Sequence, residues 1–135
     1  MFADRLHAVW MIVIAALVGA YWGIYFLSGA TQIRTDAVYL GFENSFPLAD
    51  AWMATAFLLA ARSLWRGEES AVLWGCCAGS AMIFLGCMDL LFNLTQGNFG
   101  LAPTPGLLAE IMIVVVCLSY GPFAIVYCWR RRHGR

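Results

Sequence analysis

Four long apolar segments constrain this chain more than any other feature of its sequence. They cover approximately residues 8–29, 47–65, 71–95 and 105–129. Each is close to the roughly 20 residues that an α-helix needs to cross the hydrocarbon core of a bilayer. Hydrophobic residues make up 62% of the 135 residues, well above the roughly 45–50% of a soluble domain. We therefore predict an all-α, integral membrane four-helix transmembrane bundle of up-down topology, forming one domain over residues 1–135.

The arginines predict how this bundle is oriented. The chain has no Lys. Arg5 precedes the first apolar segment, Arg62 and Arg66 lie at the end of the second, and four arginines follow the fourth. Arg34 is the one exception. Basic residues near membrane segments favour the cytoplasmic side, so both termini should be cytoplasmic (N-in/C-in). The expected location is the bacterial inner membrane. The lipid bilayer is the expected surrounding, and we expect no nucleic-acid partner.

Three carboxylates lie inside or at the edge of the apolar segments, and all fall at the non-cytoplasmic end. They are Asp50, Asp89 and Glu110. Ionisable residues are costly in membrane segments and therefore mark functional sites. On a helical wheel each acid shares its face with small residues, as Asp89 does with Gly86. Small residues line contacts between membrane helices, so we expect these faces to turn inward and the acids to converge.

The predicted ligand-binding residues have different weights. Asp50 lies in a first helical turn, where the helix dipole alone favours an anion. Asp89 lies toward the C-terminal end of its segment, where the dipole disfavours an anion, so we predict that it is the central ligand or proton carrier. Asp50 and Glu110 would support it, and Asn93, one turn further on, would form a hydrogen bond. Glu43, in the outer loop of residues 31–46, would guard the entrance. No residue is assigned a catalytic role.

Several carboxylates in one poorly hydrated pocket cannot all stay ionised without a counter-charge. Three arrangements follow. A cation, either a metal ion or an amine, lies among them; one or more are protonated and take part in proton transfer; or Arg34 folds over and pairs with them. Aromatic residues gather at the same end, and their ring faces would attract an organic cation. This group comprises Trp22, Tyr25, Phe26, Tyr39, Phe42, Phe46, Phe92 and Phe99.

Motifs for metals and cofactors are absent from the sequence. His7 and His133 both fall on the predicted cytoplasmic side, and the five cysteines lie within apolar segments without a C-x-x-C motif. We therefore expect no zinc centre, no other metal centre built from His or Cys ligands, and no cofactor. The cysteines fit the role of small packing residues.

The leading functional hypothesis is a small membrane protein whose acidic, outward-facing pocket binds or transports a cation or cationic small molecule, with proton coupling as one form. Two alternatives stay open. One is an intramembrane enzyme that acts on a lipid-like substrate through a protonated carboxylate. The other is an accessory subunit whose acids pair with a partner's basic residues. A thin four-helix core is also consistent with a homodimer or a larger membrane complex.

Overall fold

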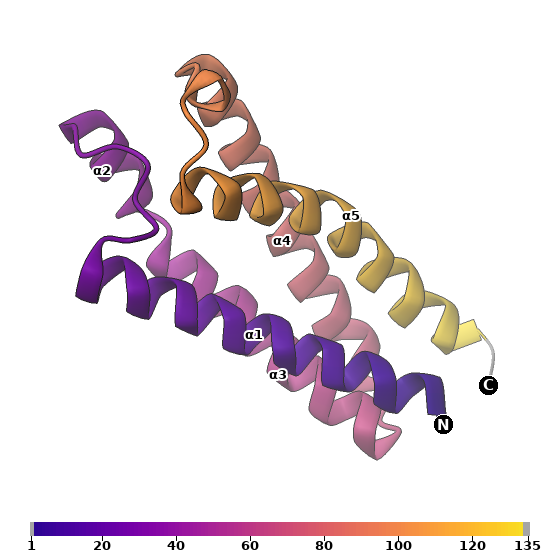
Figure 1. Cartoon of the computed structure of the whole chain (residues 1–135). Helices are drawn as coiled ribbons and strands as arrows, with labels where there is room; N and C mark the ends of the chain where they lie inside the picture. Colours follow the sequence, from indigo (N-terminus) through magenta and orange to yellow (C-terminus); the bar gives the residue numbers. More distant parts are fainter. Residues whose placement is uncertain (1, 134–135) are drawn as a thin grey trace.

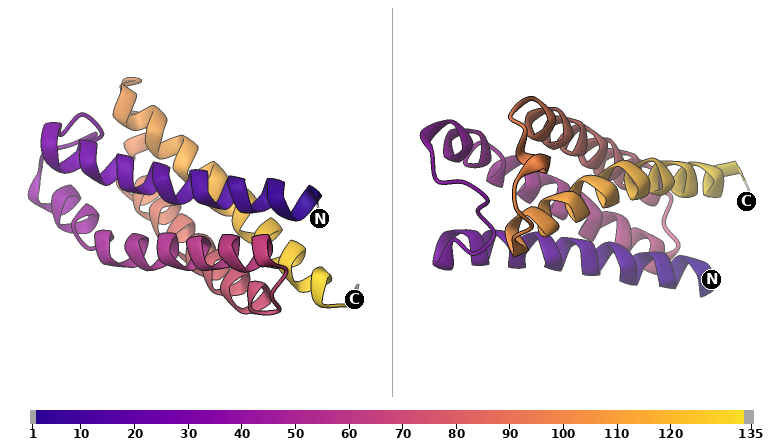
Figure 2. Two further views of the ribbon diagram at one scale, coloured as in Figure 1. Left: turned by 90° about the horizontal axis from the view of Figure 1, so that it is seen from below. Right: turned by 45° about the horizontal axis from the view of Figure 1, so that its top comes forward.

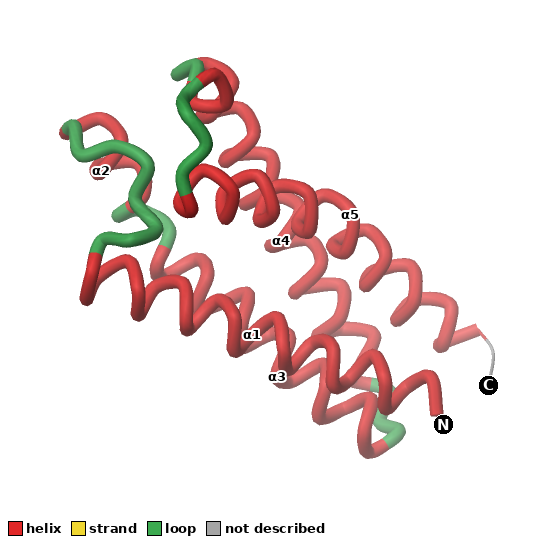
Figure 3. The backbone as a smooth tube through the Cα atoms, in the orientation of Figure 1, coloured by secondary structure: helices red, strands yellow, loops and turns green. Residues whose placement is uncertain are grey.

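The computed structural model describes residues 2–133, which are mostly helical and contain no strand. Two short helices lie in the connections between the long ones (Figure 3). The elements are α1 (Phe2–Ser28), α2 (Ala37–Glu43), α3 (Pro47–Arg66), α4 (Ser70–Thr95), the 3-10 helix η1 (Asn98–Gly100) and α5 (Pro105–His133).

The long helices pack in the order α1, α3, α4, α5, each against the next and running in alternating directions (Figure 1). The beginning of α1, the end of α5 and the turn between α3 and α4 lie at one end of the bundle, which we call the terminal end. The short helices α2 and η1 lie at the opposite end, the loop end (Figures 1 and 2). The pairs α1–α3, α3–α4 and α4–α5 pack along their length. Within the described residues, α1 and α5 do not pack against each other in this way.

Three helices among the described residues are long and apolar enough to cross a membrane, namely α1, α4 and α5. This indicates a membrane protein. The sequence predicts a fourth span, but α3 does not reach the same hydropathy because it contains Asp50, Arg62 and Arg66. It nevertheless lies between α1 and α4, and Phe57 and Ala60 on it are fully buried. The apolar face of α3 thus belongs to the core.

The helix bounds differ from the sequence expectation mainly at the terminal end. We expected the first helix to begin near residue 8, but α1 begins at Phe2. Asp4 in its first turn has a favourable interaction with the helix dipole. Its carboxylate also accepts a hydrogen bond from the Tyr127 hydroxyl at 3.0 Å and pairs with Arg131 at 3.2 Å. These contacts with α5 stabilise the early turns of α1, and α5 itself continues to His133.

Small residues allow α4 and α5 to approach closely. A Cβ atom placed on Gly86 would lie 2.6 Å from Cys117 Cβ, and one placed on Gly79 would lie 2.6 Å from the backbone oxygen of Gly121. Real Cβ atoms do not tolerate such distances, so larger residues here would push the helices apart. This contact lies along the small-residue faces that the sequence pattern singles out.

The first apolar segment also contains a small-residue pattern, Gly19-x-x-x-Gly23, which lies in α1 and behaves differently. Cβ atoms placed on Gly19 and Gly23 would meet no heavy atom of the described residues within 4 Å. Among the described residues, the Gly-x-x-x-Gly pattern of α1 is therefore not used for close helix packing.

Candidate acidic binding site

Three carboxylates from different elements meet at the loop end of the bundle. Among the described residues, one oxygen each of Glu43 (α2), Asp89 (α4) and Glu110 (α5) lie within 4.8 Å of one another. The side chains are almost completely removed from solvent, with 4%, 9% and 2% of their residue surfaces exposed. We call these three residues the acidic cluster.

The short helix α2 places Glu43 in the cluster. We expected residues 31–46 to form an outer loop, part of it lying along the membrane or folding back as a lid. Instead, Asp36 accepts a hydrogen bond from the backbone N–H of Tyr39 at 3.2 Å and thereby caps a short helix. The ring of Phe42 then stacks on Phe92 of α4, with ring centroids 3.8 Å apart and an interplanar angle of 7°. This contact fixes α2 against α4, so Glu43 is a buried member of the cluster rather than a residue at its entrance.

Asp50 lies outside the cluster, although the sequence predicts that it joins Asp89 and Glu110. Its carboxylate accepts a hydrogen bond of 2.8 Å from the indole nitrogen of Trp22 on α1. Asp50, in the first turn of α3, thus contacts α1, whereas Glu43 on α2 lies beside Asp89 and Glu110. Asp50 still lines the cavity onto which the cluster opens.

Two buried amides connect to the cluster. The side-chain nitrogen of Asn93 donates to Glu110 Oε1 at 2.9 Å and to the backbone oxygen of Asp89 at 2.9 Å. The side-chain nitrogen of Asn98 in turn donates to Asn93 Oδ1 at 2.9 Å. Both amides are fully buried. Asn98 was missed in the sequence analysis, although a polar residue directly after Gly97 at a helix end offered a weak signal.

Arg34 reaches the cluster only through these amides. Its Nη1 donates to Asn98 Oδ1 at 3.1 Å, and its Nε pairs with Asp36 at 2.7 Å. Within the described residues no basic side chain forms an ion pair with Glu43, Asp89 or Glu110. Direct pairing by Arg34, one of the three arrangements considered from the sequence, is therefore not what the structure contains.

Glu43 is the member of the cluster that lies outside the long helices. Burial raises its pKa to about 8, and the nearby Glu110 carboxylate acts in the same direction. The Tyr21 hydroxyl donates to Glu43 Oε2 at 3.5 Å and opposes the shift by stabilising the charged form. Glu43 Oε1 is buried and has no hydrogen-bond partner in the described part of the chain. At neutral pH and without a counter-charge, Glu43 is therefore mostly protonated.

A cavity of about 380 Å³ extends from the acidic cluster between α1 and α5. Apart from the cluster, Asp50, Tyr21 and Trp22, its walls are largely apolar, and they come mainly from α1 and α5. They include Ile14, Leu17, Val18, Ile24, Phe46, Met53, Met82, Leu85, Met112, Ile113 and Val116. Because its polar groups gather at one end, the cavity is suited to a ligand with one charged and one apolar part.

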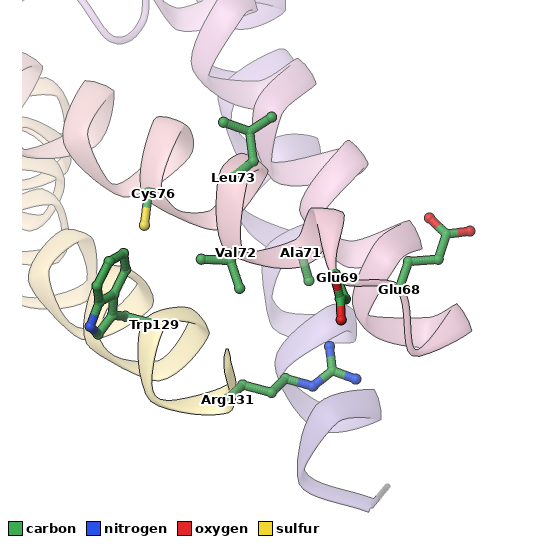
Figure 4. Close-up of a pocket in the computed structure, with 8 residues that line it drawn as sticks. All are labelled: Glu68, Glu69, Ala71, Val72, Leu73, Cys76, Trp129 and Arg131. Carbon is green, nitrogen blue, oxygen red and sulfur yellow. The ribbon is translucent and has the colours of Figure 1, made fainter. Parts of the chain in front are cut away.

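A larger hollow of about 690 Å³ lies at the terminal end, where Trp129 and Arg131 of α5 face the first turns of α4 (Figure 4). It is lined by charges of both signs, Glu68, Glu69 and Arg131, and Arg131 also pairs with Asp4. Basic and acidic side chains pair at this end, since Arg66 lies 3.8 Å from Glu68 and Arg131 pairs with Asp4. Among the described residues no such pair reaches the acidic cluster. We therefore place the candidate site at the loop end, although its cavity is smaller.

No known protein family, curated protein or solved structure matches the chain. The fold and the site define its class by themselves. It is a helical membrane protein with a cluster of buried carboxylates.

Proposed function

We propose that the protein is a four-helix transmembrane protein of the bacterial inner membrane that binds and transports a cation or cationic small molecule in its acidic cavity. Both termini lie in the cytoplasm, where the positive-inside rule places the arginines of the terminal end. The helix α3 is the fourth span in this arrangement. Residues 51–61 within it are uncharged, and Arg62 and Arg66 extend toward the cytoplasmic headgroups.

One observation carries this proposal. Glu43, Asp89 and Glu110 are buried together without an ion pair from any basic side chain of the described residues. Buried like charges are unfavourable unless a counter-charge or protons compensate them. A bound cation supplies the counter-charge, and protons supply it when the cation leaves. The raised pKa of Glu43, about 8, supports such an exchange near physiological pH.

A second candidate is the intramembrane enzyme. It is favoured by the position of the cavity between α1 and α5, because a lipid-like substrate would reach it from the side in the proposed membrane. A protonated carboxylate of the cluster would then act as a general acid. Turnover of a lipid-like substrate by the purified protein, lost in Asp89→Asn, would favour this alternative over transport.

The proposal is tested by calorimetry on the purified protein in detergent, at about pH 9, where Glu43 is mostly ionised. The probes are Mn²⁺, methylammonium and 4-phenylbutylammonium. We expect at least one to bind, and Asp89→Asn to weaken that binding by about 30-fold or more, since removing one partner of a buried charge pair costs at least ~2 kcal/mol. Uptake of the same cation into proteoliposomes should be lost in this variant.

The matched control is Glu68→Gln, which removes a carboxylate at the terminal end, next to the second hollow. It should leave both binding and uptake unchanged. If none of the three cations binds, or if the two variants behave alike, the acidic cluster is not a cation site.

A further inference from the structure

The shape of the cavity says more about the ligand than its charge does. Three carboxylates lie at one end of the cavity, which has a volume of about 380 Å³, and the rest of its walls are mostly apolar. Pockets for small organic ligands begin at roughly 300 Å³. A bare metal ion would fill only the space among the carboxylate oxygens and would leave the apolar part unused.

The unsatisfied oxygen of Glu43 indicates which kind of charged group the ligand carries. Glu43 is 4% exposed, and its Oε1 lacks a hydrogen-bond partner within the described residues. Buried polar atoms are normally hydrogen-bonded, and leaving one unsatisfied costs free energy. Carboxylates only accept hydrogen bonds when ionised. A cation that carries N–H donors would therefore satisfy both the charge of the cluster and this oxygen.

The gap between α1 and α5 indicates where the apolar part lies. At the terminal end the gap is closed by Asp4 with Tyr127 and Arg131, and by the ring of His7, whose centroid lies 3.8 Å from that of Tyr127. At the loop end it is closed by the segment around Thr31, since a Cβ atom on Gly106 would lie 2.9 Å from the backbone oxygen of Thr31.

Between these closures the walls are apolar and partly open. Leu17 on α1 is 62% exposed and Met112 on α5 is 67% exposed, and both line the cavity. In the proposed membrane these side chains lie at the depth of the lipid tails. An apolar group between them would contact both protein and lipid.

We infer that the ligand is an amphipathic primary ammonium compound, with its ammonium group among Glu43, Asp89 and Glu110 and its apolar body between α1 and α5. This inference rests on the proposed function and adds the chemical class of the ligand. It separates three features that can be varied one at a time, namely the charge, the apolar body and the gap that holds it.

The experiment compares 4-phenylbutylammonium with three related probes by calorimetry, each against detergent alone. Methylammonium keeps the charge and lacks the body, 4-phenylbutan-1-ol keeps the body and lacks the charge, and Mn²⁺ is a cation without N–H donors. We expect 4-phenylbutylammonium to bind about tenfold or more tighter than methylammonium, since burying its phenyl and methylene groups removes apolar surface from water. The alcohol should not bind measurably.

The gap is tested by Ala109→Trp, because Ala109 lines the cavity on α5. Filling this space should weaken the binding of 4-phenylbutylammonium by about tenfold or more and leave the binding of methylammonium nearly unchanged. The control is Val115→Trp on the same helix, since Val115 is 59% exposed and does not line the cavity. If Ala109→Trp does not fold, Ala20→Trp fills the cavity from α1 instead.

The outcomes distinguish the class of ligand from the existence of the cation site itself. Equal or tighter binding of methylammonium or Mn²⁺ overturns the amphipathic ligand but leaves a cation site. Binding of the alcohol as tight as that of the amine overturns the role of charge. If Ala109→Trp weakens the binding of both amines equally, the placement of the apolar body is overturned. If no cation binds, the proposed function is overturned as well.

Discussion

The two ends of the bundle differ in how the charges of their acidic side chains are compensated. At the terminal end Asp4 pairs with Arg131 and accepts a hydrogen bond from Tyr127. At the loop end the acidic cluster brings three carboxylates within 4.8 Å of one another, and its hydrogen bonds come from neutral groups, Asn93 and Tyr21. Within the described residues, Asp4 is therefore compensated by a base, whereas the three carboxylates of the acidic cluster are not.

This contrast supports placing the candidate site at the loop end. Unpaired buried charges are costly, and proteins keep them where a ligand or a proton completes the arrangement. Arg34 is close enough to reach Asn98, yet its ion pair is with Asp36. The missing counter-charge is therefore not explained by a lack of arginine at the loop end.

The largest effect on stability is expected for Asn93→Ala. This change removes the direct hydrogen-bond donor to Glu110 and leaves Asn98 without its acceptor, both in a buried setting. The free energy of unfolding should fall by about 2–3 kcal/mol, since a buried group that loses its partner keeps its full desolvation cost. Thermal or denaturant unfolding in detergent measures this loss.

The matched control is Gln96→Ala, which removes an exposed amide near the end of α4. Its unfolding should change by less than ~0.5 kcal/mol. Equal effects of the two substitutions would show that the buried amides do not support the cluster.

The second prediction concerns pH. The pKa of Glu43 is raised from its ordinary value to about 8, so the folded protein binds this proton more tightly than the unfolded chain. Its contribution to stability is fully present below the ordinary pKa and is lost as the pH rises through about 8. Without an added cation, the melting temperature should therefore fall between about pH 5 and pH 9.

Glu43→Gln should flatten this dependence, because the amide has no proton to lose. Glu68→Gln, at the terminal end, should leave the slope of the original protein unchanged. A saturating cation should oppose the fall in melting temperature, since it replaces the lost proton as the counter-charge. An unaltered slope in Glu43→Gln would mean that this carboxylate does not titrate in the folded protein.

Much of the fold could be predicted from the sequence, because it depends on local and periodic signals. Apolar segments of membrane-spanning length predict the long helices, and the small-residue faces of α4 and α5 predict their contact. The structure supports three spans by hydropathy, and α3 is the exception because Asp50 and its arginines offset its apolar residues.

The site was less accessible to sequence reasoning. The positions of Asp89, Asn93 and Glu110 follow from helical faces, which are periodic. Glu43 and Asn98 lie in connections, where the backbone path depends on tertiary contacts such as the stacking of Phe42 on Phe92. No sequence periodicity predicts these contacts. The presence of Glu43 in the cluster, in place of Asp50, therefore could not be predicted.

The smallest effect is expected at the terminal end and has the opposite sign to its counterpart at the loop end. Asp4→Asn removes the ion pair with Arg131, whose two side chains are 20% and 15% exposed. The loss should be less than ~1 kcal/mol, and it should shrink at about 1 M salt because screening weakens an accessible pair. Asp89→Asn, measured without a cation at about pH 9, should instead stabilise the protein, since it removes one of the like charges. Unfolding curves of both variants at low and high salt test the contrast, and destabilisation of similar size in both would mean that the two ends do not differ in how their charges are compensated.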